Sequence, residues 1–183
     1  MKILFAPMEG IAHWLYRSAQ HACFDGAGEY FLPFWSPRGQ SLTHREQADV
    51  LPENNAGMKA VPQILSNSSE DFLWAADKLK ALGYEEVNIN LGCPSGTVVR
   101  KHRGAGLLAY PEELERFLDV VFEKSPVAVS LKTRLGMESP EEWPALLELF
   151  NRYPARRLIL HPRSRAEQYG GSPHREWYDY TLR

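Results

Sequence analysis

Residues 86–106, EVNINLGCPSGTVVRKHRGAG, contain the pattern that best indicates how this chain folds. The stretch opens with a short apolar-rich run, which predicts a buried β-strand over residues 86–90. Asn90 and Cys93 follow at the carboxyl end of that strand, and Pro94 stiffens the loop behind them. The loop then carries a run of basic residues: Arg100, Lys101, His102 and Arg103. We therefore expect a functional site at the carboxyl end of this buried strand and of the strands that lie beside it.

Short apolar runs alternate with amphipathic helical stretches on both sides of this segment. The apolar runs predict strands at residues 2–6, 28–34, 59–65, 86–90, 126–132 and 157–161. The stretches between them predict helices at 13–23, 68–82, 111–123, 140–153 and 177–182. The second helix begins at Ser68, which with Asp71 resembles a capping box, and it ends at Gly83. This alternation indicates βαβ units, with parallel strands covered by helices.

Six such units fit either an open doubly wound sheet or most of a (β/α)8 barrel. No GxGxxG motif follows the first strand, so the dinucleotide-binding fingerprint of the open fold is absent. Polar residues instead follow several strands, as expected for a barrel whose chemistry lies at the carboxyl ends of its strands. A complete barrel needs about 250 residues. We therefore predict that residues 1–183 form one truncated domain, an incomplete TIM (β/α)8 barrel of about six β/α units.

Composition excludes several classes of protein. Hydrophobic residues make up 44% and charged residues 24% of the chain, which is typical of a globular protein and not of a disordered one. The formal charge of −2 gives no global reason to expect a nucleic-acid partner. Two cysteines without a CxxC pair, and histidines that never pair at i, i+4, predict neither a disulfide scaffold nor a metal site. The amino-terminal apolar run breaks at Pro7, too early for a signal peptide, so we expect a cytoplasmic protein.

Cys93 is the strongest candidate for chemistry. A lone cysteine is often a small buried hydrophobe, and that interpretation fits Cys23 on its predicted helix. Beside Cys93, Gly92 permits close approach of a ligand, Pro94 stiffens the loop, and basic residues follow. A thiol in such a place has a pKa that its surroundings tune for proton transfer.

Three further polar residues lie on or after predicted strands, and each has two interpretations. Lys132 is either a lysine whose ammonium reaches solvent or one that meets an anion, a ring nitrogen or a carbonyl. His161 is either structural or, with the arginines of HPRSR, part of a phosphate site. Gln63 is a buried amide that needs partners, and the edge of a heteroaromatic ring would supply them. The basic loop after Cys93 is likewise either a solvated turn or a contact for the phosphates of a polyanion.

Several segments, in order along the chain, resemble the tRNA-dihydrouridine synthases. They are APMEG (6–10), VPQI (61–64), VNINLGCPSGTVVRKHRGAGLL (87–108), VSLKTRLG (129–136) and LILHPRSRAEQYGG (158–171). The resemblance implies a flavin mononucleotide (FMN) enzyme that uses NADPH to reduce the C5–C6 bond of uridines in tRNA. It also implies that Cys93 is the general acid that protonates C5.

The resemblance assigns further residues by position. Those that it places against FMN are Pro7, Met8, Glu9, Gln63, Lys132 and His161. Asn90 would hold the flipped-out uracil. Those that it places near RNA are Arg100, Lys101 and Arg103 in the basic loop, and Arg134, Arg163 and Arg165, for which flavin is the other candidate.

The sequence departs from the family at two places. QILSNSSEDF replaces the usual Gly- and Pro-containing stretch after Gln63, and the family continues with strands 7 and 8 and a carboxyl-terminal helical domain. An arc of six strands has two open edges, so self-association through those edges is expected. In the family, loops after strands 7 and 8 grip the flavin phosphate, so weak FMN binding and little synthase activity are expected of this chain alone. Two alternatives stay open: a flavin barrel of the dihydroorotate dehydrogenase kind, and a non-catalytic fragment or RNA-binding module.

Overall fold

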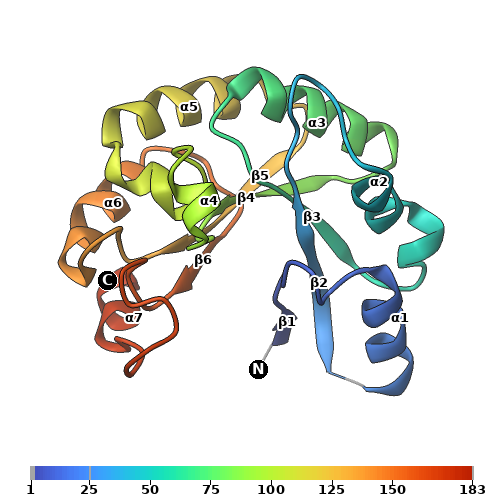
Figure 1. The fold of residues 1–183 in the computed structure, drawn as a ribbon, viewed down its shortest axis with the longest axis horizontal. Coiled ribbons are helices and arrows are strands. Elements are labelled where there is room, and N and C mark those ends of the chain that lie inside the picture. Colours follow the sequence, from blue (N-terminus) through green and yellow to red (C-terminus); the bar gives the residue numbers. More distant parts are fainter. Residues whose placement is uncertain (1–2, 25, 183) are drawn as a thin grey trace.

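A computed structural model describes residues 3–24 and 26–182 of the chain. Its six strands are all parallel and form one sheet in sequence order. They are β1 (Ile3–Phe5), β2 (Ala27–Trp35), β3 (Ala60–Ile64), β4 (Glu86–Leu91), β5 (Ala128–Arg134) and β6 (Leu158–His161). The sheet curls into an open arc with helices along its convex side (Figure 1). The expected incomplete TIM barrel is confirmed.

The helices follow the expected order, with additions. They are α1 (Trp14–Cys23), α2 (His44–Val50), α3 (Ser69–Ala81), α4 (Gly96–Val99), α5 (Pro111–Lys124), α6 (Trp143–Phe150) and α7 (Glu176–Thr181). Three 3₁₀ turns are η1 (Pro52–Asn55), η2 (Gly104–Ala109) and η3 (Pro140–Glu142). The helix expected at 140–153 is divided between η3 and α6. At α3, the Ser68 hydroxyl accepts from the Asp71 N–H at 3.2 Å, whereas the Ser68 N–H donates to Ser66 Oγ. The cap is therefore present without the reciprocal half of a capping box.

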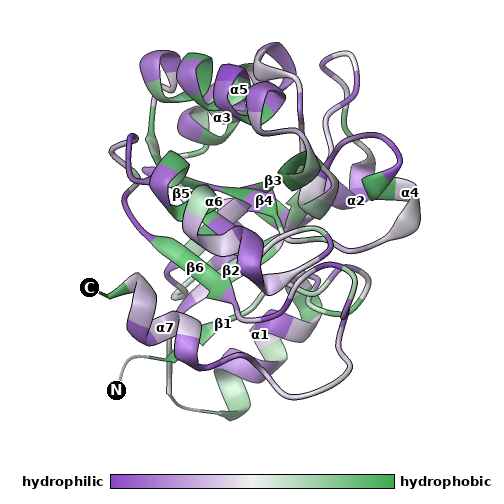
Figure 2. Ribbon diagram, turned by 90° about the vertical axis from the view of Figure 1, so that its left-hand side faces the viewer, coloured by the Kyte–Doolittle hydropathy of each residue, from purple (hydrophilic) through white to green (hydrophobic). Residues whose placement is uncertain are grey.

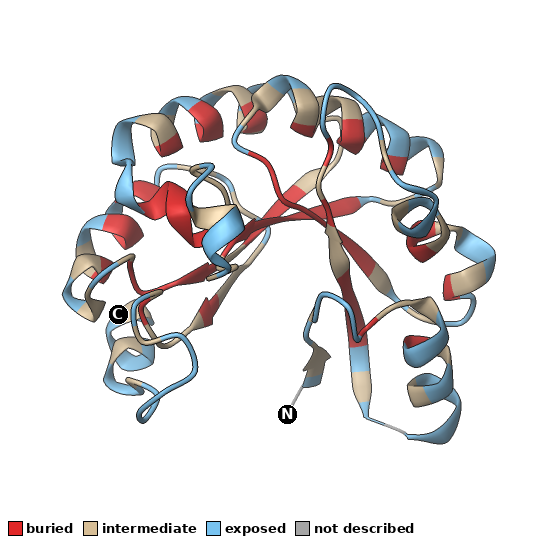
Figure 3. Cartoon of the chain, in the orientation of Figure 1, coloured by how far each residue is buried: buried red, intermediate tan, exposed pale blue. Residues whose placement is uncertain are grey.

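The hydrophobic core lies between the convex face of the sheet and the helices (Figure 3). Phe72 on α3 and Phe117 on α5 meet edge to face, with ring centroids 5.8 Å apart. Figure 2 shows hydrophobic and hydrophilic residues alternating along both helices, as expected for helices with one buried side. On β4 the apolar Val87, Ile89 and Leu91 belong to this core. The alternate residues of β4 therefore point to the concave face, and these are polar.

Helix α1 differs from its sequence interpretation. Its apolar residues Leu15, Ala19, Ala22 and Cys23 are exposed, so the interpretation of Cys23 as a core residue is wrong. The buried side chain of α1 is Arg17. Its guanidinium donates to Asp49 O at 2.7 Å and to Asn55 Oδ1 at 2.8 Å. These bonds fix the orientation of α1 and turn its apolar side outward.

Within the described residues, no helix is long and apolar enough to cross a membrane. The same part of the chain contains no group of three or more His, Cys, Asp or Glu residues suited to a metal ion.

Candidate active site

A cavity of about 480 Å³ lies where the strands end on the concave side of the arc. It is lined by Pro7, Met8, Glu9, Ile11, Phe34, Gln63, Asn90, Gly92, Cys93, Pro94, Ser95, Lys132, Arg134, His161 and Tyr169. The structure therefore brings the proton-donor candidate together with all six residues expected against the flavin. The volume of the cavity is within the range of about 300–1,000 Å³ that is usual for ligand sites.

A chain of buried polar side chains runs beneath the cavity, and two of its members, Gln63 and Asn90, line the cavity itself. Asn90 Nδ2 donates to Gln63 Oε1 at 2.7 Å, and Gln63 Nε2 donates to Asn88 Oδ1 at 2.7 Å. Asn88 Nδ2 in turn donates to Ser130 Oγ at 2.9 Å. The sheet register produces this order, because Gln63 pairs with Asn88 across β3 and β4, and Asn88 pairs with Ser130 across β4 and β5. Gln63 keeps a second amide hydrogen for a ligand.

Asn90 also fixes the loop that carries Cys93. Its Oδ1 accepts from the N–H of Gly92 at 3.0 Å and from the N–H of Cys93 at 2.9 Å. From the other side, the N–H of Ala105 donates to Cys93 O at 3.1 Å. Gly104, with φ of +55°, leaves no room for a side chain, since a Cβ there would lie 3.0 Å from the Cβ of Cys93. The thiol is thus held in place by its own strand and by η2.

Two opposing effects act on the pKa of the Cys93 thiol. Burial raises it above its ordinary value and prevails over the cations of Arg134 and Lys132, which lower it. The thiol therefore keeps its proton at neutral pH. A protonated thiol is the state that a general acid requires.

Lys132 faces the same cavity from β5, in register with Asn90. Burial and, secondarily, the charge of Arg134 lower its pKa. In the described part of the chain, no side chain or carbonyl accepts a hydrogen bond from its ammonium. A half-buried ammonium without an acceptor favours a ligand with an anionic or electron-rich atom at this point.

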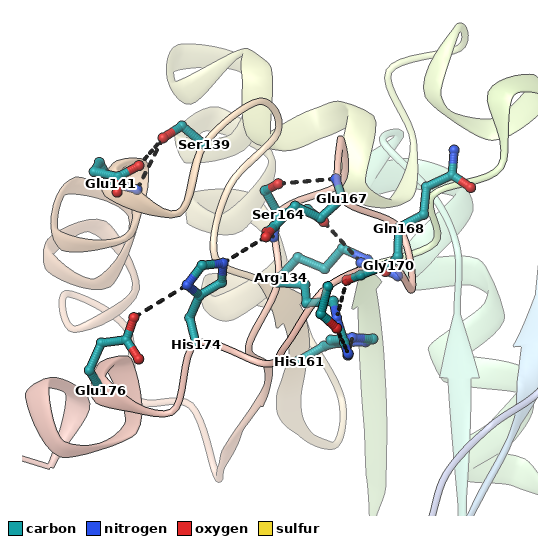
Figure 4. Close-up of polar contacts among 12 residues, drawn as sticks. Arg134, Ser139, Glu141, His161, Ser164, Glu167, Gln168, Gly170, His174 and Glu176 are labelled. Atoms are coloured by element: carbon teal, nitrogen blue, oxygen red, sulfur yellow. Dashed lines mark hydrogen bonds and ion pairs between the residues drawn. The ribbon is translucent and has the colours of Figure 1, made fainter.

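Arg134 joins two loops at the rim of the cavity (Figure 4). Its Nε donates to Gly92 O at 2.8 Å, beside Cys93. Its Nη1 donates to Ser164 O at 3.0 Å and to Gln168 O at 2.7 Å, in the loop after β6. Only 1% of this residue is exposed. Nε and Nη1 of Arg134 are therefore bound to backbone carbonyls, while the residue also lines the cavity, and its expected role toward flavin or RNA stays a prediction.

Tyr169 is a lining residue that sequence reasoning missed. Its ring lies 5.3 Å from the guanidinium carbon of Arg134 and 5.9 Å from the ring of His161. It stands at the mouth of the cavity with 71% of its surface exposed. A tyrosine in a Gly-containing loop gives no periodic signal, so only its neighbours in space reveal its place.

His161 and Arg163 follow β6. Burial, followed by the charges of Arg134, Lys132 and Arg163, lowers the pKa of His161 to about 4, so its imidazole is neutral at neutral pH. Arg163 donates from Nε to Gly170 O at 2.9 Å and from Nη2 to Gly171 O at 3.0 Å. These two bonds hold the loop that brings Tyr169 to the cavity.

A second set of bonds closes the same loop on its outer side (Figure 4). Glu167 accepts from the N–H of Ser164 at 2.7 Å and lies 2.6 Å from His174 Nε2. The hydrogen bond that His174 donates to the Glu167 carboxylate raises the pKa of His174. Arg165 lies outside the cavity, and its buried Nε has no partner among the described residues.

The basic loop does not line the cavity. Arg103 donates from Nε to Asn67 Oδ1 at 3.1 Å and from Nη1 to Ser36 Oγ at 3.4 Å, so it anchors this loop to its neighbours. Arg100 donates from Nε to Gly96 O at 3.2 Å, and both Arg100 and Lys101 are exposed.

Comparison with known proteins agrees with this geometry. The model of the family "Dihydrouridine synthase (Dus)" matches residues 4–180. The "Probable tRNA-dihydrouridine synthase 1" of Synechocystis sp. is 36% identical over 180 residues, covering 96% of this chain and 49% of that protein. The "tRNA-dihydrouridine synthase B" of Vibrio cholerae is 32% identical over 172 residues, covering 92% of this chain and 52% of that protein.

A third relative, the "tRNA-dihydrouridine(16) synthase" of Ralstonia nicotianae, is 26% identical over 183 residues, covering 96% of this chain and 56% of that protein. The chain spans about half the length of the curated relatives that it matches. Since the family model matches nearly all of its residues, this chain belongs to the dihydrouridine synthase family.

Proposed function

We propose that this chain carries the catalytic face of a tRNA-dihydrouridine synthase, which reduces the C5–C6 bond of uridines in tRNA with FMN and NADPH. The observation that carries the proposal is the half-buried thiol of Cys93, which shares one cavity with Gln63, Lys132 and His161. Family membership supports the substrate class, because relatives are named for dihydrouridine formation in tRNA.

The donor set of the cavity fits a flavin. An isoalloxazine ring presents carbonyl oxygens and ring nitrogens along one edge, and it needs donors beside an apolar surface. The second amide hydrogen of Gln63 and the ammonium of Lys132 are such donors, while Pro7 and Met8 supply apolar surface. When bound and reduced, FMN supplies the hydride that adds to C6 of the uracil.

The residues of the chain complete the reaction. Cys93 donates its proton to C5, so the double bond gains one hydride and one proton and becomes a single bond. The thiolate that remains is stabilised by the nearby charges of Arg134 and Lys132, and it regains a proton from solvent. Asn90 holds the Cys93 loop in position through Oδ1 and presents its remaining amide hydrogen to the uracil.

The alternative of a dihydroorotate dehydrogenase is less well supported. That enzyme would act on a free base, whereas the match to dihydrouridine synthases and the basic residues after Cys93 favour a polynucleotide. Oxidation of dihydroorotate by the purified chain would favour the alternative instead.

Two measurements test the proposal. The first is a titration of the chain with FMN, followed by quenching of flavin fluorescence. We expect Lys132→Met to weaken binding at least tenfold, and Lys124→Met, which removes an exposed lysine at the end of α5, to leave it unchanged. Equal binding by all three proteins would contradict the assignment of Lys132.

The second measurement is the mass of uridines in unmodified tRNA after incubation with the chain, FMN and NADPH. Any dihydrouridine that the wild type forms is expected to be lost in Cys93→Ala. Activity that survives in Cys93→Ala would exclude this cysteine as the essential proton donor.

A further inference from the structure

A second depression opens directly beside the catalytic cavity. It is a groove of about 620 Å³ between the loop after β2 and helix α4. The groove and the cavity share three residues, Glu9, Phe34 and Ser95, so the two are continuous. Its walls also include Arg38, Ser41, Arg45, Glu46, Asp49 and Thr97.

Two of the three carboxylates in the groove are used by the protein itself. Glu46 accepts from the N–H of Ser36 at 2.9 Å and from the N–H of Thr43 at 2.8 Å, and so caps α2. Asp49 is 5% exposed and accepts from the N–H of Trp14 at 2.6 Å. Glu9, at the junction with the cavity, is the carboxylate that remains exposed.

The two arginines of the groove, by contrast, are available to a ligand. Arg38 and Arg45 are both exposed. In the described part of the chain, neither guanidinium forms a hydrogen bond or an ion pair with another residue. The hydroxyls of Ser41 and Thr97 add neutral donors to the walls of the groove. Arginine forks beside hydroxyl groups are the donor set that binds phosphate oxygens.

We propose that this groove binds the sugar-phosphate backbone of RNA next to the uridine that enters the cavity, with Arg38 and Arg45 as its phosphate contacts. The inference rests on the proposed function, because it takes the substrate to be tRNA. An enzyme that acts on a flipped-out base must hold the flanking backbone at the mouth of its pocket. The groove provides such a place, since one end opens into the cavity and one wall is α4, which leads to the exposed Arg100 and Lys101.

The basic loop alone does not account for this role. Arg103 is bound to Asn67 and Ser36, so only part of that loop is free to contact RNA. Arg38 and Arg45 come from a different segment, between β2 and the first turn of α2, on the other wall of the groove. RNA in the groove would therefore meet the two arginines on one wall and, past the α4 wall with its Thr97 hydroxyl, the exposed Arg100 and Lys101.

The test is binding of unmodified tRNA to the 183-residue chain at several KCl concentrations, by fluorescence anisotropy. The Arg38→Gln/Arg45→Gln variant is expected to bind on the order of tenfold more weakly at 0.1 M salt. The slope of log K against log salt should fall by about 1.4–1.8, since two phosphate contacts are lost. The Arg38→Lys/Arg45→Lys variant keeps both charges and should retain most of that slope.

The matched control is Lys80→Gln/Lys124→Gln. It removes the same charge from the carboxyl-terminal ends of α3 and α5, which lie at the opposite end of the sheet from the cavity. Its binding curve should coincide with that of the wild type. Superimposable circular dichroism spectra of all variants exclude misfolding as the cause of any difference.

Each other result overturns the inference. If wild-type chain binds tRNA and the Arg38/Arg45 variant binds as well as the control, the groove is not the RNA site, while the proposed function stands. If the wild type binds no tRNA even at low salt, both the groove and the RNA substrate are excluded for this chain. If NADPH binding, and not tRNA binding, is lost in the variant, the arginines serve the dinucleotide instead.

Discussion

The guanidinium of Arg157, directly before β6, pairs with the carboxylate of Glu29 on β2, although 128 residues separate them in sequence. A second nitrogen of Arg157 bonds Glu86 on β4 at 2.7 Å, and Lys59 adds a bond to Glu29 at 2.8 Å. The side chain of Glu29 is fully buried, and 6% of that of Glu86 is exposed. The two pairs of Arg157 connect strands that are not neighbours in the sheet. They therefore hold the arc curled at the end of the strands opposite the cavity.

Replacement of Arg157 by Leu is expected to lower the free energy of unfolding by about 1–3 kcal/mol, because the buried Glu29 and Glu86 each lose one charged hydrogen-bond partner while Lys59 and Arg156 stay beside them. Urea unfolding measures this loss. Arg152→Leu is the control, since it removes an arginine from an exposed pair with Glu115, a kind of pair that contributes about 0–1 kcal/mol. Equal losses in the two variants would show that the Arg157 pairs do not stabilise the arc.

The pH dependence of Cys93 reactivity tests its role as an acid. Because burial raises the thiol pKa, alkylation of Cys93 by iodoacetamide should rise at higher pH than alkylation of an unstructured cysteine peptide. Lys132→Met removes a cation that lowers this pKa and should shift the profile to still higher pH. Both measurements need a Cys23→Ser background, since Cys23 is exposed. A profile at or below that of the peptide would contradict a protonated thiol.

The pKa of His161 predicts how stability changes in acid. The folded-state pKa is about 4 and the ordinary value is 6.5, so between these values the unfolded chain binds more protons than the folded chain. The contribution of His161 to stability is therefore present above pH 6.5 and is lost as pH falls toward 4. The charged groups that influence the pKa of His161 are Arg134, Lys132, Arg163 and Glu167.

Urea unfolding of wild type and His161→Gln at pH 7 and pH 4.5 measures this contribution. The wild type should lose more stability on acidification than the variant does. Identical losses would mean that His161 is protonated in the folded state near its ordinary pKa.

The strands were predicted well because each is an apolar run between turn residues, and the polar residues after them located the cavity. The register in which neighbouring strands pair could not be predicted from the sequence. Asn88 lies in the predicted strand, but its bond to Gln63 depends on the pairing of β3 with β4, which no local pattern encodes. The Arg157–Glu29 pair is hidden for the same reason, since two distant residues meet only when the sheet curls.

Helix α1 shows a second reason why the sequence prediction was incomplete. Periodicity identifies an apolar stripe but not what covers it, and in this structure the stripe of Leu15 and Ala19 is exposed while Arg17 is buried. Helix α2 was missed because HREQADV has few apolar residues, and its start depends on the capping box of Thr43 and Glu46.

The amide chain under the cavity gives a last prediction, about Asn88, which does not line the cavity itself. Asn88→Ala leaves Gln63 Nε2 without its acceptor and removes the donor to Ser130, so we expect a loss of about 1–3 kcal/mol in the free energy of unfolding. Asn151→Ala, at an exposed position after α6, is the control and should cost less than about 0.5 kcal/mol.

A double-mutant cycle separates the bond between Asn88 and Gln63 from the general cost of each truncation. Gln63→Ala, Asn88→Ala and the double variant are compared by urea unfolding. Since both side chains are buried and their amides lie 2.7 Å apart, the double variant should lose less stability than the sum of the single ones, by about 0.5 kcal/mol or more. Additive losses would show that Gln63 is oriented by Asn90 alone. A coupled result would mean that the amide facing the proposed flavin edge is set by a residue one strand away and outside the cavity.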